Sequence, residues 1–344
     1  MVRIRSGWLA AIAAVGLVTV ACKKNDDKAA QTGSGTTTTT TTKTSGDKGA
    51  TPVAVAGADD LALLPVDSEM VMGLNFAQLQ QSALWKQFSP KLTEKASAGL
   101  AEFKVACGFD PLEAVKTVSM GLKGLGGQTP DGAIVVHGPE KAKVMACVGK
   151  AKEEAAKKGT DITVDGDVFI VKDKSGEPVA FTFVNDSTMI ATIGTMGNKD
   201  AVLAAAKGTS TLKSSQSFVE MYSKINTNDS LWMLMNGNSP AFSKMGAMGV
   251  KPKAIFGSIN VTDGLTMDMR IRLGTPDEAK QLVTMLQGQI NNPQVKQMFD
   301  KLDVVADGSD AKFGIAMSNQ KLQQLIGMVG GMMGGMMGGG MGGP

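Results

Sequence analysis

Histidine is the side chain that most often performs general acid–base catalysis near neutral pH, and the chain has a single one, His137. It follows the apolar run Ile134-Val135-Val136 and precedes Gly138-Pro139, which is typical of a junction between a strand and a helix. A Ser-His-Asp triad would have to use it, but no Gly-x-Ser-x-Gly motif accompanies it. We therefore expect His137 to be a structural residue, and we predict no catalytic residue and no enzyme activity.

The residues that could hold a metal ion or a phosphate group lack the required spacing. Zinc needs several His or Cys ligands, and the chain offers one histidine and three cysteines in all. Asp165 and Asp167, like Asp307 and Asp310, flank a glycine in a turn without the spacing of a calcium loop. The glycine-rich run 121–127 lacks Gly-Lys-Ser/Thr and leads into another strand. We predict no metal and no cofactor.

Cys22 is the residue with the clearest chemical role. It follows Trp8–Ala21, an uncharged and mostly apolar run of 14 residues that is short for a membrane span and has the length of a signal-peptide core. The run ends in Thr19-Val20-Ala21-Cys22, which resembles the lipobox of bacterial lipoprotein precursors, although that family usually has an aliphatic residue in place of Thr19. The resemblance implies that residues 1–21 are a signal peptide and that Cys22 carries lipid such as palmitate. An ordinary secretory signal that happens to contain Cys22 is the alternative.

Two further resemblances concern the mature chain. In many lipoproteins, an aspartate after the lipidated cysteine retains the protein at the inner membrane, so Lys23 implies the outer membrane. The stretch Leu64–Asn75, followed by Ser82-Ala83-Leu84-Trp85, is similar to the start of the mature domain in uncharacterised predicted lipoproteins. That similarity implies no known activity.

If Cys22 carries lipid, Cys107 and Cys147 remain as a pair. An exported, oxidising compartment favours a disulfide between them. Two buried thiols or a redox couple are the alternatives, and the Cys-x-x-Cys spacing typical of redox couples is absent. We predict a structural disulfide.

Composition limits the class of partner. The whole chain has a formal net charge of +3, and removal of residues 1–21 with their two arginines leaves +1. A nearly neutral chain has no electrostatic basis for binding nucleic acid. Aromatic residues make up only 5% of the chain while 23 methionines add apolar volume, so we expect a methionine-rich core.

Polar or repetitive segments flank the folded region. Residues 22–57 contain an unbroken run from Thr36 to Thr42 and almost no large apolar side chain, so we expect a disordered tether. Residues 327–344 consist almost entirely of glycine and methionine. A disordered tail, a glycine-spaced membrane or self-association segment, and a soft-metal site of Met thioethers are all open for this tail.

The folded region alternates between strand and helix patterns. Asp-Gly pairs at 165–166, 263–264 and 307–308 predict hairpins, and short turns between neighbouring strands imply antiparallel sheets. Ser89-Pro90, Pro139 and the capping box Thr275-Pro276-Asp277-Glu278 each predict the start of a helix. The sequence therefore predicts an α+β fold with antiparallel sheets and helices packed on one face.

The order of elements is expected to occur twice. A strand, two further strands, a helix and a hairpin follow one another from Met70 and again from Trp232. We therefore expect two similar α+β halves, residues 58–226 and 227–326, as an internal duplication would produce.

These expectations combine into a lipid-anchored protein of the cell envelope, attached to a membrane through Cys22 and placed at the outer rather than the inner membrane. Its predicted role is non-enzymatic, either structural or based on interaction with an unidentified envelope protein. The alternative is a carrier or binder of a lipid or another hydrophobic ligand, because methionine-rich strands would suit the lining of an apolar site.

Overall fold

A computed structural model gives the fold of the central part of the chain. It describes residues 60–327 except 95–96, 126–128, 158, 173–175, 209–210, 238, 240–241 and 243–249. The predicted signal peptide, Cys22, the predicted tether and all of the Gly/Met tail but Gly327 lie outside these residues.

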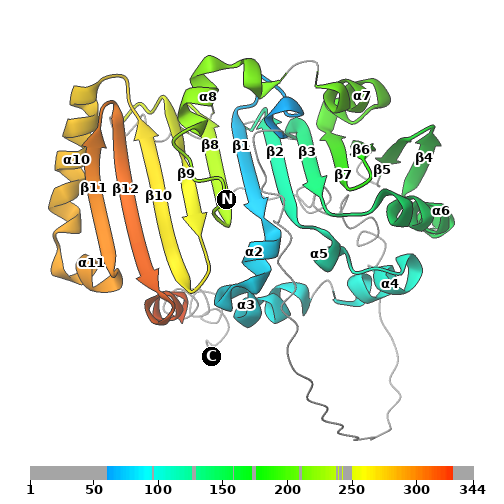
Figure 1. Ribbon diagram of the computed structural model, residues 1–344, viewed down its shortest axis with the longest axis horizontal. Coiled ribbons are helices and arrows are strands. Elements are labelled where there is room, and N and C mark those ends of the chain that lie inside the picture. The colour runs from blue at the N-terminus through cyan, green and yellow to red at the C-terminus, as the bar shows by residue number, and fades with distance from the viewer. Residues whose placement is uncertain are drawn as a thin grey trace, which may run out of the picture.

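The strands of the described region form one antiparallel sheet of twelve strands in the order β11-β12-β10-β9-β8-β1-β2-β3-β7-β6-β5-β4 (Figure 1). They are β1 (Met70–Asn75), β2 (Thr117–Lys123), β3 (Asp131–His137), β4 (Asp161–Asp165), β5 (Val168–Lys172), β6 (Pro178–Asn185), β7 (Thr188–Ile193), β8 (Leu231–Asn236), β9 (Ala254–Asn260), β10 (Gly264–Arg272), β11 (Lys301–Asp307) and β12 (Asp310–Ser318).

Helices connect and cover these strands. The α-helices are α2 (Phe76–Gln81), α3 (Ala83–Glu94), α4 (Ser97–Cys107), α5 (Pro111–Ala114), α6 (Lys141–Lys157), α7 (Lys199–Lys207), α8 (Gln216–Tyr222), α10 (Pro276–Ile290) and α11 (Pro293–Met298). Among the described residues, short 3-10 helices also occur at η2 (Asp60–Ala62), η3 (Gly194–Met196) and η4 (Leu212–Ser214), and residues 319–327 are helical. None of the described helices has the length and apolar character needed to cross a membrane.

The Asp-Gly turns form where the sequence predicts them. Gly166 joins β4 to β5 with φ +61°, and Gly308 joins β11 to β12 with φ +60°. A left-handed backbone at these positions is strained for residues with a Cβ, which is why glycine suits a two-residue hairpin. The α+β class with an antiparallel sheet is thus confirmed.

The helices lie on both faces of the sheet, which corrects the expectation of one covered face. On one face, Val71 and Val135 pack with Val202 of α7 and Phe218 of α8. We call this the Val71 face. On the opposite face, the strands pack with α6 in the first half of the chain and with α10 in the second. The reason is visible in β3, where five consecutive residues are buried and therefore need cover on both sides.

The strand order is similar on either side of the central pair β1 and β8. One side runs β1-β2-β3-β7-β6 and the other β8-β9-β10-β12-β11, with a helix (α6 or α10) after the third strand in each. The first half adds the hairpin β4–β5 at its outer edge. Because β1 pairs with β8, the two predicted halves share one continuous sheet. Their origin by duplication stays a prediction.

Candidate functional site

The central strands carry an apolar face that is only partly covered. On β8, Trp232 and Leu234 are buried on the Val71 face, whereas the alternate residues Met233 and Met235 are half-buried. The same asymmetry occurs on β9, where Phe256 is buried on the Val71 face. We call the half-buried side chains on the other side of β1, β8, β9 and β10 the methionine face: Met72, Leu74, Leu231, Met233, Met235, Ile255, Ile259, Leu265, Met267 and Met269.

Helices border this face on two sides. Of the described helices on this side of the sheet, α10 packs closely on β11 and β12, and α6 packs on β4. Phe76 of α2 packs, like Met72 and Met235, at the edge of the second core cluster. In Figure 1 the strands β1, β8, β9 and β10 lie between the ends of the sheet that carry α10 and α6.

The chemistry of the methionine face is uniform. Its ten side chains contain no nitrogen, oxygen or charge. Polar ligand groups placed on it would lose their hydrogen bonds to water without replacement, whereas a hydrocarbon would lose nothing and would gain contact. Methionine is unbranched and polarizable, so its side chain adapts to an apolar partner of irregular shape. The face therefore suits a hydrocarbon chain better than a polar molecule.

His137 belongs to a hydrogen-bonded cluster on the Val71 face. Its Nε2 lies 2.7 Å from Oδ1 of Asp60, and its Nδ1 lies 3.1 Å from Oγ1 of Thr188. The hydroxyl of Ser119 donates to the other Asp60 oxygen at 2.6 Å. Four elements, η2, β2, β3 and β7, bring these groups together.

The cluster contains the residue types of a hydrolytic triad, but its hydroxyl groups are not accessible to a substrate. The two hydroxyls that could act as nucleophiles belong to Ser119, which is fully buried, and to Thr188, which is 5% exposed. A substrate carbonyl would have to reach one of these oxygens. The arrangement instead supplies the buried Asp60 carboxylate with two hydrogen-bond partners, which buried charges require. His137 therefore has a structural explanation, and the absence of enzyme activity stays a prediction.

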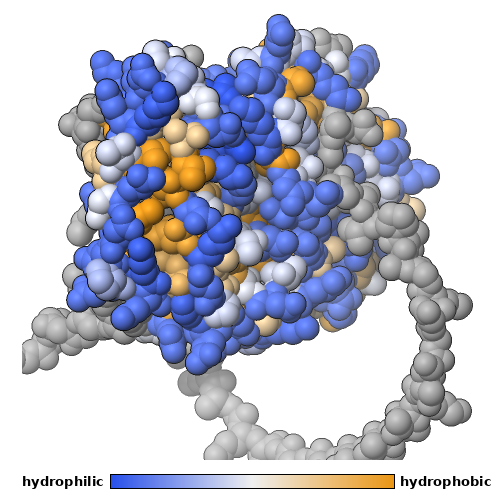
Figure 2. All heavy atoms as spheres, turned by 60° about the vertical axis from the view of Figure 1, so that its left-hand side comes forward, coloured by the Kyte–Doolittle hydropathy of each residue, from blue (hydrophilic) through white to orange (hydrophobic). Residues whose placement is uncertain are grey.

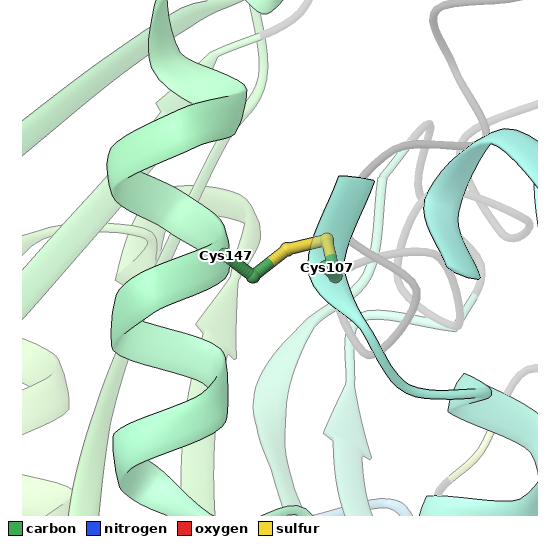
Figure 3. Close-up of a disulfide and its surroundings, with 2 residues drawn as sticks. All are labelled: Cys107 and Cys147. Carbon is green, nitrogen blue, oxygen red and sulfur yellow. A yellow bond between two sulfur atoms is a disulfide. The ribbon is translucent and has the colours of Figure 1, made fainter. Parts of the chain in front are cut away.

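The two cysteines of the folded region are joined as predicted. A disulfide links Cys107, the last residue of α4, to Cys147 in α6 across 40 residues of sequence (Figure 3). Cys147 is 1% exposed and packs among the buried residues of α6, such as Val148. The bond fastens α4 to the helix that covers the first half of the sheet.

A second buried carboxylate, Asp310, lies on the Val71 face of the second half. It is 1% exposed and accepts hydrogen bonds from the Arg272 guanidinium and from Lys224 Nζ at 2.9 Å. Burial alone would raise the pKa of Asp310, but these two cations outweigh it and hold the pKa below its ordinary value. The same contact raises the pKa of Arg272, chiefly through the hydrogen bond to Asp310.

The other aspartates of the predicted turns also have structural roles. The guanidinium of Arg270 donates to Asp307 at 2.5 Å and lowers the pKa of that carboxyl. Asp165 and Asp167 pair with Lys199 and Lys141 at the surface. Within the described residues, no three His, Cys, Asp or Glu side chains are grouped so that they could hold a metal ion.

The remaining segments considered in the sequence are the glycine-rich run and the termini. Residues 121–125 end β2 and begin its connection to β3, so the run joins strands as expected, while 126–128 lie outside the described residues. Cys22, the predicted lipidation site, and residues 328–344 likewise lie outside the described residues.

Two groups of residues were missed by the sequence analysis. Asp60 lies 77 residues from its partner His137, and no local pattern connects them. Arg272 and Asp310 lie opposite one another on β10 and β12, which are separated in the sequence by α10, α11 and β11, so no local pattern connects them either. The sequence signal for the methionine face was the alternation of Met267 and Met269 with polar residues on β10.

Comparison with known proteins assigns no family. No family model matches the sequence, and neither does any curated protein. A solved structure, crystal form III of TP0453, is similar over 79% of this chain and 98% of its own, with 9% sequence identity and a TM-score of 0.49. A similarity at that level carries no conclusion about activity, so the function must be argued from the residues.

Proposed function

We propose that this chain is a lipid-anchored, non-enzymatic protein of the cell envelope whose folded part binds a hydrocarbon chain, such as the acyl chain of a lipid, on the methionine face. The observation that carries the proposal is the half-buried state of ten apolar side chains on four adjacent strands. Soluble proteins rarely leave apolar surface of this kind contiguous unless it has a partner.

The anchor is proposed from the N-terminal sequence. The signal-like run that ends at Cys22 would deliver the chain to the envelope, and Lys23 favours the outer membrane. In cells grown with labelled palmitate, the wild-type chain should incorporate label and fractionate with membranes. Cys22→Ala should remove both properties. If that variant is processed and retained at the membrane like the wild type, the anchor proposal is wrong.

Binding of a hydrocarbon on the methionine face is tested with two neighbouring residues of β10 whose side chains point to opposite faces of the sheet. Met267 belongs to the methionine face, whereas Thr266 is exposed on the Val71 side. Met267→Lys places a charge where a hydrocarbon would lie, and its long side chain can still reach water, so folding should be retained. Thr266→Lys is the matched control, since it adds the same charge to the same strand.

The measurement is binding of a fluorescent fatty acid to the chain expressed without residues 1–22, so that no attached lipid competes. Met267→Lys should weaken binding at least tenfold, about 1.4 kcal/mol, and Thr266→Lys should leave it unchanged. Equal binding by both variants, or no binding by the wild type, would exclude this ligand site. In that case the alternative of a purely structural or protein-binding envelope role is favoured.

A further inference from the structure

The sheet has two outer strands, and their charges differ in a way that matters for self-association. The order of strands ends at β11 on one side and at β4 on the other. An outer strand presents unpaired N–H and C=O groups that can pair with another strand. Which strand it accepts depends on the side chains that would lie opposite one another.

The β4 strand opposes pairing with its own copy. It begins with Asp161 and ends with Asp165. Antiparallel pairing of two copies about Thr163 would place Asp161 of each copy opposite Asp165 of the other. Like charges directly opposite one another destabilise a strand pair.

The β11 strand has the reverse property. Antiparallel pairing of two copies about Val304 would place Lys301 of each copy opposite Asp307 of the other. Leu302 would then face Ala306 on the side of the sheet that α10 covers, where Val304 already belongs to the third core cluster. Opposite charges would thus meet at both ends of the pair, and apolar side chains would meet in its middle on the side that α10 covers.

The backbone of β11 is oriented for this pairing. The side-chain amide of Gln287 in α10 donates to the carbonyl oxygen of Val304 at 3.3 Å, so that carbonyl points away from β12 toward the outer edge. By the alternation of an antiparallel ladder, the backbone groups of Leu302 and Ala306 point the same way. A carbonyl oxygen has two lone pairs, so Val304 can accept a second hydrogen bond without displacing Gln287.

Exposed apolar side chains surround the same edge. Val305 on β11 is 50% exposed, Met285 on α10 is 52% exposed and Met298 on α11 is 38% exposed. Figure 2, which brings this end of the sheet forward, shows apolar residues gathered in a patch framed by hydrophilic ones. Contact with a second copy would remove part of this surface from water.

We propose that two copies of this chain associate through their β11 strands, paired antiparallel about Val304 across a two-fold axis. The contact is isologous, because each copy contributes the same strand, and it joins two twelve-stranded sheets into one. The inference is independent of the ligand proposed for the methionine face, since it rests on a different strand and on different residues.

The register is tested by cysteine cross-linking of the full chain, purified in a mild detergent. In the proposed pair, Asp303 lies opposite Val305 of the other copy at a position without backbone hydrogen bonds, where Cα atoms are about 4.5 Å apart, within the range of a disulfide. Asp303→Cys/Val305→Cys should therefore form a disulfide-linked dimer on a non-reducing gel after mild oxidation. Lys301→Cys/Asp303→Cys is the matched control, with the same spacing and exposed positions on the same strand, and should stay monomeric on the gel. A linked dimer in the control alone, in both variants or in neither would overturn the register.

Charge exchange tests the interface without cysteines. Lys301→Asp alone and Asp307→Lys alone each place like charges at both ends of the strand pair, so each should raise the apparent dissociation constant of the dimer at least tenfold by analytical ultracentrifugation. When the two variants are mixed, the two aspartates of one variant, at positions 301 and 307, lie opposite the two lysines of the other, so a heterodimer should form. Circular dichroism should show that both variants remain folded. Wild-type chains that are monomeric at tens of micromolar, or a mixture that stays monomeric, would refute the proposal.

Discussion

The indole of Trp232 lies directly against the backbone of Gly73 on the neighbouring central strand. The two residues are paired in register between β8 and β1, and the Trp232 side chain packs on the Val71 face. Trp232 is 1% exposed, and the ring of Tyr222 packs edge-on against it at 5.2 Å between centroids. A Cβ added to Gly73 would overlap the indole nitrogen and its neighbouring ring carbons. The pairing of the two halves of the sheet therefore depends on a glycine at this position.

Gly73→Ala should destabilise the fold for this reason. The indole is enclosed and cannot move aside freely, so an added methyl group should cost about 1–3 kcal/mol of unfolding free energy. Gly149→Ala is the control, because Gly149 lies within helix α6 and an added Cβ would meet nothing within 4 Å. Alanine there should stabilise the helix by up to about 1 kcal/mol. Urea denaturation measures both, and a Gly73→Ala variant as stable as the wild type would contradict the proposed overlap.

Asp310 should make the stability of the fold sensitive to acid. Its folded pKa is lowered by Arg272 and Lys224, and that of Asp307 by Arg270, relative to about 3.9 in an unfolded chain. A lowered folded pKa contributes stability that is present above pH 4 and is lost as the pH falls through the folded value. Unfolding free energy measured from pH 7 to pH 2 should therefore decrease most below pH 4.

Asp310→Asn tests the cause of that dependence. The variant leaves Arg272 without its buried counter-charge, so at pH 7 it should lose about 3 kcal/mol. Its stability should also vary less between pH 5 and pH 2, because one of the linked carboxyls is gone. Asp67→Asn removes an exposed partner of Lys123 and should cost at most about 1 kcal/mol. An Asp310→Asn profile parallel to that of the wild type would show that Asp310 does not carry the effect.

The hydrogen-bonded pair of Asp60 and His137 should be energetically coupled. Each replacement, Asp60→Ala or His137→Ala, leaves the other group with one hydrogen-bond partner fewer, at a cost of about 1–3 kcal/mol. The double variant removes both groups, so it should cost less than the sum of the two single changes. Ser119→Ala and Thr188→Ala should show weaker effects, because each removes one neutral hydroxyl. Strict additivity in the cycle would mean that the 2.7 Å contact contributes nothing.

Helix caps and turns could be predicted from the sequence, because residues close in the chain determine them. The capping box at Thr275 forms as predicted, with the Glu278 N–H donating to the Thr275 hydroxyl and the Gly274 N–H donating to the Glu278 carboxylate. The Asp-Gly turns at Gly166 and Gly308 form hairpins because glycine takes a left-handed backbone without strain. These features depend on residues within four positions of each other.

The prediction that Ser89-Pro90 opens a helix was wrong. The helix α3 begins at Ala83, where the Ser82 hydroxyl accepts a hydrogen bond from the Trp85 N–H, and Pro90 lies inside it. Ser82 was the available signal, since serine is a favoured N-cap residue. The partners of the site residues could not be predicted from the sequence. Those of His137 and of Arg272 come from distant strands and helices, and only the folded topology brings them together.

The disulfide should stabilise the first half of the sheet without being needed for its fold. Closing a loop of 40 residues contributes about 3–4 kcal/mol in the loop-entropy treatment. Cys107→Ser/Cys147→Ser should lower the unfolding free energy by about that amount and keep the secondary structure, because α6 also packs through Val144 and Val148. In the wild type, alkylation without reductant should leave both cysteines unmodified, and reductant should expose them. Labelling of both cysteines before reduction would show that the two residues are not joined in the protein as isolated.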